Sequence, residues 1–232
     1  MSELKRPTEY WNDQARHWQN YQYPLIPSAQ DVEFQMRHVV RGGSVLILGA
    51  TKELCAAAVE IADSVTAVDY AADVIDALRQ DGVQYVNNEW GIFFNASHGK
   101  FDTIMTDGGL LCLDFPKGWG SIIEQAREHL NPQGFFTARI YTNAGLPSDE
   151  LLANPDFGRF MAGMQNAQAP NWMINPANMN PAVYGAYDMR YALPPQHAIE
   201  QIFQDSRLKI NEIQVPQSPV GRYFPSYAAQ NI

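Results

Sequence analysis

The sequence predicts an α/β protein with a doubly wound, mostly parallel sheet of seven strands, completed by a C-terminal antiparallel hairpin. Strand-like and helical segments alternate at intervals of roughly twenty residues over 44–141, as in right-handed β-α-β units. The first strand-like segment, 44–48, is a short apolar run, typical of a strand buried on both faces. Two further strand-like segments, 208–216 and 223–230, have no helix-length segment between them and should pair antiparallel.

The individual strands and helices are predicted from the periodicity of apolar residues and from the residues that typically begin or end each element. The parallel strands are expected at 44–48, 65–69, 83–87, 101–107 and 135–141. Helices are expected between them because apolar side chains recur on one helical face, as Leu54, Ala58 and Ile61 do. Helices are predicted within the segments 27–43, 53–62, 71–82 and 120–134. The first is expected to be capped near Ser28, and the last to end at a proline and a glycine.

Four parts of the chain are predicted. Residues 1–43 form an aromatic-rich helical lead-in, expected to act as a lid, and 44–141 form an α/β core that binds a cofactor. Residues 142–195 are rich in proline, asparagine, methionine and aromatic side chains, and are predicted to form an inserted cap. This cap would line a substrate pocket or a homodimer interface. Residues 196–232 supply a helix and the hairpin that completes the sheet.

Composition narrows the function classes. The net charge is −9, and without a basic run the chain is a poor candidate for binding nucleic acid or anionic membranes. It has no run of 18 apolar residues and no signal-peptide pattern, so a cytoplasmic protein is expected. The two cysteines and five histidines do not follow a metal-ligand spacing, so no metal site is predicted.

The ends of the first four strands carry the candidate site, because ligands of open α/β sheets bind at the carboxyl edge. A phosphate site would favour glycines and a basic residue there. Three of these ends instead carry a carboxylate, which suits hydroxyls, an exocyclic amine or a cation. The strand-end residues are Gly49, Ala50, Thr51, Asp69, Tyr70, Glu89, Trp90, Asp107 and Gly108.

Four short motifs stand at these ends: "LGATKEL", "VTAVDYA", "NEW" and "DGGLLCL". In this order they resemble class I S-adenosylmethionine-dependent methyltransferases, specifically a bacterial small-molecule branch with an LGxTxEL first motif. The resemblance covers about 10–141. It departs at Ile47, where an acidic residue is usual, and at Lys52, where a proline is usual.

The resemblance implies a seven-stranded Rossmann-like fold and a set of cofactor contacts. Gly49 would let the backbone pass close to the methionine portion of S-adenosylmethionine. Asp69 would accept hydrogen bonds from the ribose hydroxyls, and Tyr70 would pack on the adenine. Glu89 would accept a hydrogen bond from the adenine amine, with the Trp90 backbone beside the ring.

The resemblance also implies that Asp107 and Gly108 lie near the sulfonium. Glu53 is a candidate contact for the cofactor's ammonium, although first-turn carboxylates also favour a helix start. Thr51 is a candidate cofactor contact that also suits a helix N-cap. The remaining predicted cofactor-binding residues are Ala50 and, from the lead-in, Tyr10 and Trp18.

The leading function is methyl transfer from S-adenosylmethionine to a small-molecule acceptor (EC 2.1.1). Where the acceptor must lose a proton, the candidate bases are Asp107, Tyr141 and His98. An NAD-dependent oxidoreductase is an alternative, because Asp69 would suit a ribose, but the second and third glycines of a dinucleotide turn are missing. A non-catalytic, methyltransferase-like cofactor-binding module is the other alternative.

Overall fold

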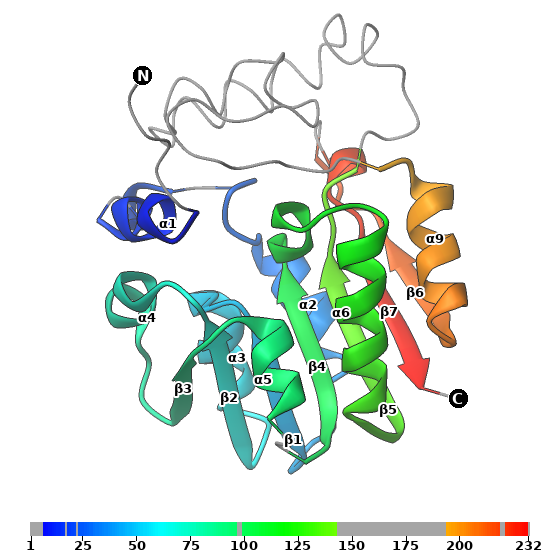
Figure 1. Cartoon of the computed structure of the whole chain (residues 1–232), viewed down its shortest axis with the longest axis horizontal. Helices are drawn as coiled ribbons and strands as arrows, with labels where there is room; N and C mark the ends of the chain where they lie inside the picture. The colour runs from blue at the N-terminus through cyan, green and yellow to red at the C-terminus, as the bar shows by residue number, and fades with distance from the viewer. Residues whose placement is uncertain are drawn as a thin grey trace, which may run out of the picture.

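A computed structural model describes residues 7–16, 18–21, 23–96, 99–142, 194–218 and 221–231 of the chain (Figure 1). Its centre is a seven-stranded sheet in the order β3-β2-β1-β4-β5-β7-β6. The first five strands run parallel, and β7 pairs antiparallel with both β5 and β6. The predicted fold class is therefore confirmed. The strands are β1 (Ser44–Leu48), β2 (Ser64–Asp69), β3 (Val83–Asn87), β4 (Phe101–Asp107), β5 (Leu130–Arg139), β6 (Leu208–Gln214) and β7 (Ser226–Asn231).

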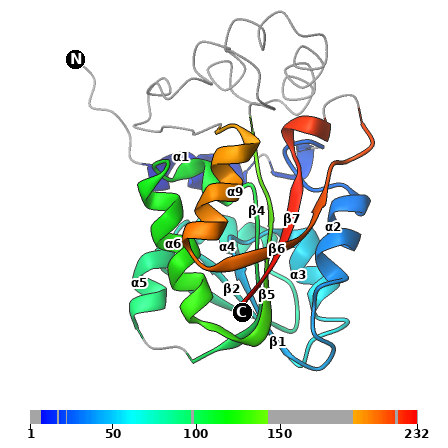
Figure 2. The same cartoon turned by 90° about the vertical axis from the view of Figure 1, so that its right-hand side faces the viewer.

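Helices cover both faces of this sheet (Figure 2). Helices α2 and α3 pack on one face, and α5, α6 and α9 pack on the other. The described helices are α1 (Pro7–Ala15), α2 (Ala29–Met36), α3 (Lys52–Ala58), α4 (Ala72–Leu78), α5 (Trp90–Asn95), α6 (Lys117–Glu128) and α9 (Gln196–Asp205), with short 3-10 turns at Trp18–Asn20, Gly109–Cys112 and Gly221–Tyr223.

Strand β1 explains why the sheet is buried on both sides. Val45 and Ile47 pack toward α2 and α3, while Leu46 and Leu48 belong to the larger core beneath α6 and α9. Successive side chains of a strand point to opposite faces, so a continuous apolar run fills two cores at once.

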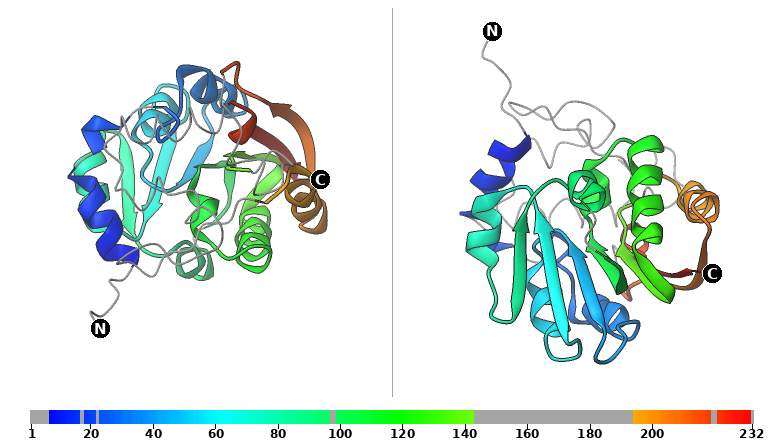
Figure 3. Two further views of the ribbon diagram at one scale, coloured as in Figure 1. Left: turned by 90° about the horizontal axis from the view of Figure 1, so that it is seen from above. Right: turned by 60° about the horizontal axis from the view of Figure 1, so that its bottom comes forward.

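The lead-in contributes two described helices. Helix α1 lies beside α4 at the rim of the sheet (Figure 3). Helix α2 begins as the sequence predicts: the Ser28 hydroxyl accepts from the Asp31 backbone N–H, and the Asp31 side chain accepts from the Ser28 N–H at 2.9 Å. This reciprocal capping box fixes the chain entering the α2 face.

Several element boundaries differ from the sequence expectation. Helix α5 was not predicted, because its sequence WGIFFN is too short to show a helical period, and it buries Phe93 and Phe94. Helices α2, α3 and α4 end earlier than expected. Strand β5 begins at Leu130, before the proline taken as a helix stop, because residues 131–134 bulge out between two paired stretches of the strand. Residues 143–193, most of the predicted cap, lie outside the described part of the chain.

Candidate active site

The carboxyl ends of β1 and β2 are joined through the Asp69 carboxylate. Its Oδ2 accepts a hydrogen bond from the Ala50 N–H at 3.1 Å, and its Oδ1 accepts from the Ala71 N–H at 2.8 Å. Burial raises the pKa of the Asp69 carboxyl, and these backbone donors oppose that rise. The carboxylate therefore fixes the glycine turn, and each oxygen keeps a further lone pair for a ligand hydroxyl.

The glycine turn rests on the ring of Trp90. Gly49 has φ +104°, and a Cβ added there would lie 3.9 Å from Trp90 Cζ2. The Trp90 Nε1–H donates to the Val68 carbonyl at 3.0 Å, which also accepts from the Gly49 N–H. On the other side, a Cβ at Gly109 would come within 2.4 Å of Trp90 Cη2. The indole therefore packs under the turn, and glycine makes room for it at Gly109, whereas Gly49 is required by its positive φ.

Two further predicted site residues, Tyr70 and Glu89, lie near Asp69. The pKa of Tyr70 is raised chiefly by burial and further by Cys112, Asp69 and Glu89. Burial raises the pKa of the Cys112 thiol to about 12, and Asp69 adds to the shift. Glu89 is exposed at the N-cap of α5. The predicted ribose and adenine residues of two strand ends are therefore close enough to influence one another electrostatically.

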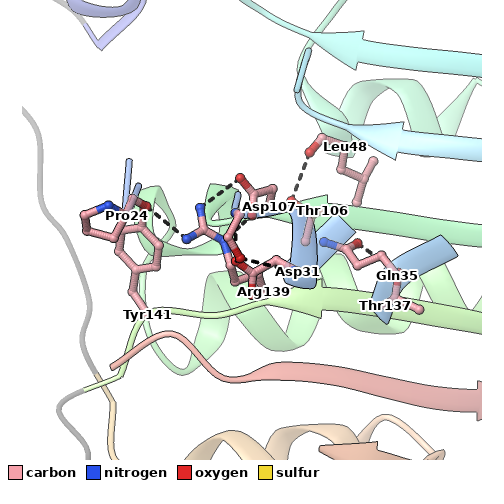
Figure 4. Close-up of polar contacts among 10 residues, drawn as sticks. Pro24, Asp31, Gln35, Leu48, Thr106, Asp107, Thr137, Arg139 and Tyr141 are labelled. Atoms are coloured by element: carbon pink, nitrogen blue, oxygen red, sulfur yellow. Dashed lines mark hydrogen bonds and ion pairs between the residues drawn. The ribbon is translucent and has the colours of Figure 1, made fainter. Parts of the chain in front are cut away.

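Asp107, at the end of β4, is engaged by a residue that the sequence analysis did not single out. Arg139 Nε and Nη2 donate to the two Asp107 oxygens, the second at 3.0 Å (Figure 4). The Arg139 and Asp107 side chains are 0% and 4% exposed. Burial raises the pKa of the Asp107 carboxyl and the guanidinium opposes this. The pair is a bidentate ion pair closed off from solvent.

Arg139 also holds the lead-in against the sheet. Its Nη1 donates to the Pro24 carbonyl at 2.9 Å, which accepts a second hydrogen bond from the Tyr141 hydroxyl at 3.1 Å (Figure 4). The buried Asp31 carboxylate acts on the same guanidinium through its charge. We call these five residues the arginine cluster: Pro24, Asp31, Asp107, Arg139 and Tyr141.

These contacts bear on the three candidate bases. Both Asp107 oxygens accept from Arg139, and the Tyr141 hydroxyl is a buried donor whose pKa burial raises to about 12. Both groups are therefore poorly suited to take a proton from an acceptor near neutral pH, and their catalytic roles stay predictions that the contacts disfavour. His98 lies outside the described residues.

The remaining predicted contacts lie around the start of α3. Thr51 occupies the N-cap position without a side-chain cap hydrogen bond. Glu53 is partly buried, and its Oε2 has no hydrogen-bond partner among the described residues. Trp18 lies in the short turn after α1, and its indole also has no described partner for Nε1. Tyr10 lies in α1, but its side chain lies outside the described part.

The arrangement suits a nucleoside better than a dinucleotide. It offers the half-buried Asp69 carboxylate to hydroxyls, the exposed Glu89 to an amine, and the partly buried Tyr70 beside them. Arg139, a cation at this edge, already forms an ion pair with Asp107, so its charge is not available to a phosphate group. The donor set therefore fits a ligand that carries hydroxyls, an amino group and positive charge, as S-adenosylmethionine does.

Comparison with known proteins identifies the fold. No family model and no curated protein matches the chain. Among solved structures, DhpI in complex with SAH is similar at TM-score 0.63 and 14% identity, covering 97% of this chain and 94% of that one. The chain has the Rossmann-like methyltransferase fold. N-methyltransferase NodS from Bradyrhizobium japonicum WM9, in complex with S-adenosylhomocysteine, is similar at TM-score 0.57 and 12% identity, covering 97% and 88%. A 1,6-didemethyltoxoflavin-N1-methyltransferase from Burkholderia thailandensis matches at TM-score 0.57 and 17% identity, covering 96% and 81%.

Proposed function

We propose that this protein transfers a methyl group from S-adenosylmethionine to a small molecule. The observation that carries the proposal is the Asp69 carboxylate, which is hydrogen-bonded to the Gly49-Ala50 turn and partly buried at the sheet edge. In this fold, ligands bind at that edge. The fold shared with methyltransferases that bind S-adenosylhomocysteine supports the same conclusion.

The motif LGATKEL and the comparisons support a small-molecule acceptor. We assign the chain to the bacterial small-molecule branch on that motif, and one similar structure is a 1,6-didemethyltoxoflavin-N1-methyltransferase. The net charge of −9 argues against nucleic acid and anionic membranes as partners, and we expect a cytoplasmic enzyme. None of the helices among the described residues is long and apolar enough to cross a membrane.

When bound, S-adenosylmethionine supplies a methyl group that is already activated by its sulfonium. The chain's task is then mainly to position two reactants in line, because charge is dispersed rather than created during transfer. Asp69 would hold the ribose, and the Gly49 backbone would allow close approach of the cofactor. Because Arg139 neutralises Asp107, the carboxylate would influence a sulfonium less than a free carboxylate would.

Calorimetry on the full chain tests the proposal. We expect S-adenosylhomocysteine to bind in the micromolar range and NAD to bind far more weakly, because a one-glycine turn leaves no room for a pyrophosphate. Micromolar NAD binding with no binding of S-adenosylhomocysteine would favour the oxidoreductase alternative. Binding of S-adenosylhomocysteine without turnover of S-adenosylmethionine on any small-molecule acceptor would favour a non-catalytic module.

A further inference from the structure

A cavity of about 420 Å³ lies between the lead-in and the start of α3. This volume suits a small organic molecule. Of the residues expected to hold the cofactor, Trp18 and Glu53 line it, whereas the strand-end residues Gly49, Asp69, Glu89 and Gly108 do not. Its main walls are Trp18, Tyr21, Ile26, Lys52, Glu53 and Leu78.

Much of the wall is apolar. The Trp18 and Tyr21 rings lie 5.4 Å apart, centroid to centroid, and Ile26 and Leu78 add aliphatic surface. Such a lining suits a carbon skeleton. The short aminobutyrate chain of the cofactor has little apolar body to match it, so the lining favours a separate molecule.

The polar part of the wall is the Glu53 carboxylate. Its Oε2 is buried and has no hydrogen-bond partner among the described residues. Burial raises the pKa of the Glu53 carboxyl most, and a hydrogen bond from the residue's own backbone N–H opposes that rise. Asp107 raises the pKa further, and Lys52 and Arg139 lower it. A buried carboxylate oxygen without a donor is unfavourable, and a ligand N–H would remove that cost.

Two cations also border the cavity, Arg16 and Lys52, and both are exposed to solvent. Water screens such groups strongly, so their repulsion of a cationic ligand is small. The buried oxygen and the two aromatic faces, which attract cations, act at shorter range in a drier environment.

We infer that this cavity binds the methyl acceptor and that the acceptor presents a protonated amine to Glu53. The inference rests on the proposed function and adds to it the substrate class. An amine must be neutral to attack the methyl carbon. The N–H bond would break with its proton passing to Glu53 and its electron pair staying on nitrogen. That pair would then form the N–C bond while the C–S bond of S-adenosylmethionine breaks, its electrons returning to sulfur and the charge moving to the product nitrogen.

Paired ligands test the inference. Phenethylamine and 2-phenylethanol share a skeleton and differ in the amine, and both can be titrated by ligand-observed NMR onto the full chain saturated with S-adenosylhomocysteine. We expect the amine to bind at least tenfold more tightly than the alcohol. Glu53→Gln should abolish this preference, and Glu60→Gln should keep it, because Glu60 is exposed just after α3. Equal binding of the two compounds, or a preference that survives Glu53→Gln, would overturn the inference.

A second variant guards against a merely structural effect of Glu53. Trp18→Ala should weaken both compounds by similar factors, because it removes apolar wall and leaves the carboxylate in place. If Trp18→Ala bound the alcohol as the parent does but lost the preference for the amine, the amine would be bound by the Trp18 ring. That result would contradict the assignment to Glu53.

The cofactor's own ammonium is the competing occupant. S-adenosylhomocysteine carries it, and 5′-methylthioadenosine lacks it. We expect Glu53→Gln to change the affinity of both by less than threefold. A large loss for S-adenosylhomocysteine alone would assign Glu53 to the cofactor and overturn the inference while the proposed function stands. If the parent binds neither nucleoside, the proposed function fails, and the amine preference can still be measured without them.

Discussion

The two halves of the carboxyl edge are built in different ways. At the ends of β1 and β2, the Asp69 side chain reaches backbone donors 19 and 2 residues away in the sequence. At the ends of β4 and β5, Arg139 reaches Asp107 at a separation of 32 residues and Pro24 at a separation of 115. The first half is partly exposed, and the Arg139 ion pair is almost fully buried.

We expect this difference to separate a surface that binds a ligand from a structural anchor. A partly exposed carboxylate whose oxygens keep lone pairs can receive a ligand at little cost. The negative charge of a buried carboxylate paired with arginine is already balanced inside the protein. Removing the arginine leaves a buried charge without a partner. We therefore expect changes in the first half to act mainly on binding and changes in the arginine cluster to act mainly on stability.

The largest effect should come from Arg139→Met. It leaves the Asp107 and Asp31 carboxylates buried without their cation, and breaking one side of a buried ion pair costs about 3–5 kcal/mol. Urea unfolding measures the change. Arg79→Met is the matched control, because its pair with Asp76 joins side chains that are 58% and 76% exposed, and it should lose less than about 1 kcal/mol. Equal stability losses in the two variants would remove the distinction between the halves.

Asp69→Ala should act on binding. It removes a charged acceptor of two ribose hydroxyls, which corresponds to a loss of roughly 2–4 kcal/mol in affinity for S-adenosylhomocysteine. Calorimetry measures the loss, and circular dichroism checks that the variant is folded. Asp81→Ala, at an exposed position before β3 on the opposite edge, should bind as the parent does. Unchanged affinity in a folded Asp69→Ala protein would refute its role.

Gly109→Ala tests the support under the glycine turn. The new Cβ would meet Trp90 Cη2 at 2.4 Å and Thr106 Oγ1 at 3.0 Å, so overpacking should cost about 1–3 kcal/mol. Gly120→Ala in α6 has no atom within 4 Å of its Cβ and should instead gain up to about 1 kcal/mol from helix propensity. Thermal unfolding of the two variants should shift in opposite directions. A neutral Gly109→Ala would mean that the indole can move aside freely.

The smallest effect concerns the other end of β4. The Ser44 N–H lowers the pKa of the Asp102 carboxyl most, burial opposes it, and the Asn131 amide and Ser44 hydroxyl lower the pKa further, so the net shift is downward. A carboxyl whose folded pKa is lowered stabilises the protein above its unfolded pKa of about 3.9, and this contribution is lost as the pH falls through the folded value. The parent should therefore be slightly more stable than Asp102→Asn at pH 7, and the gap should close below about pH 4. A gap that widens on acidification would contradict the sign.

The sheet and the strand ends at its carboxyl edge could be predicted from the sequence. Strands β1 and β4 occur at the predicted residues. The continuous apolar run of β1, bounded by turn residues, needs no distant partner to be recognised. Gly49 and Asp69 were identifiable for a similar reason: each directly follows a strand, and parallel strands bring their carboxyl ends together. The site roles of these residues stay predictions.

Other features of the molecule depend on contacts between distant parts of the chain. In the sequence, Arg139 is a single charged residue in a strand with mostly apolar neighbours. Its partners Asp107 and Pro24 lie 32 and 115 residues away. Helix α5 forms through the packing of Phe93 and Phe94 rather than through its own periodicity. The cavity at Glu53 exists because the lead-in closes over α3 and α4, and local patterns do not encode which distant segment covers which helix. Local physics specifies elements and their ends, whereas charge compensation and cavities depend on contacts made only after the chain has folded.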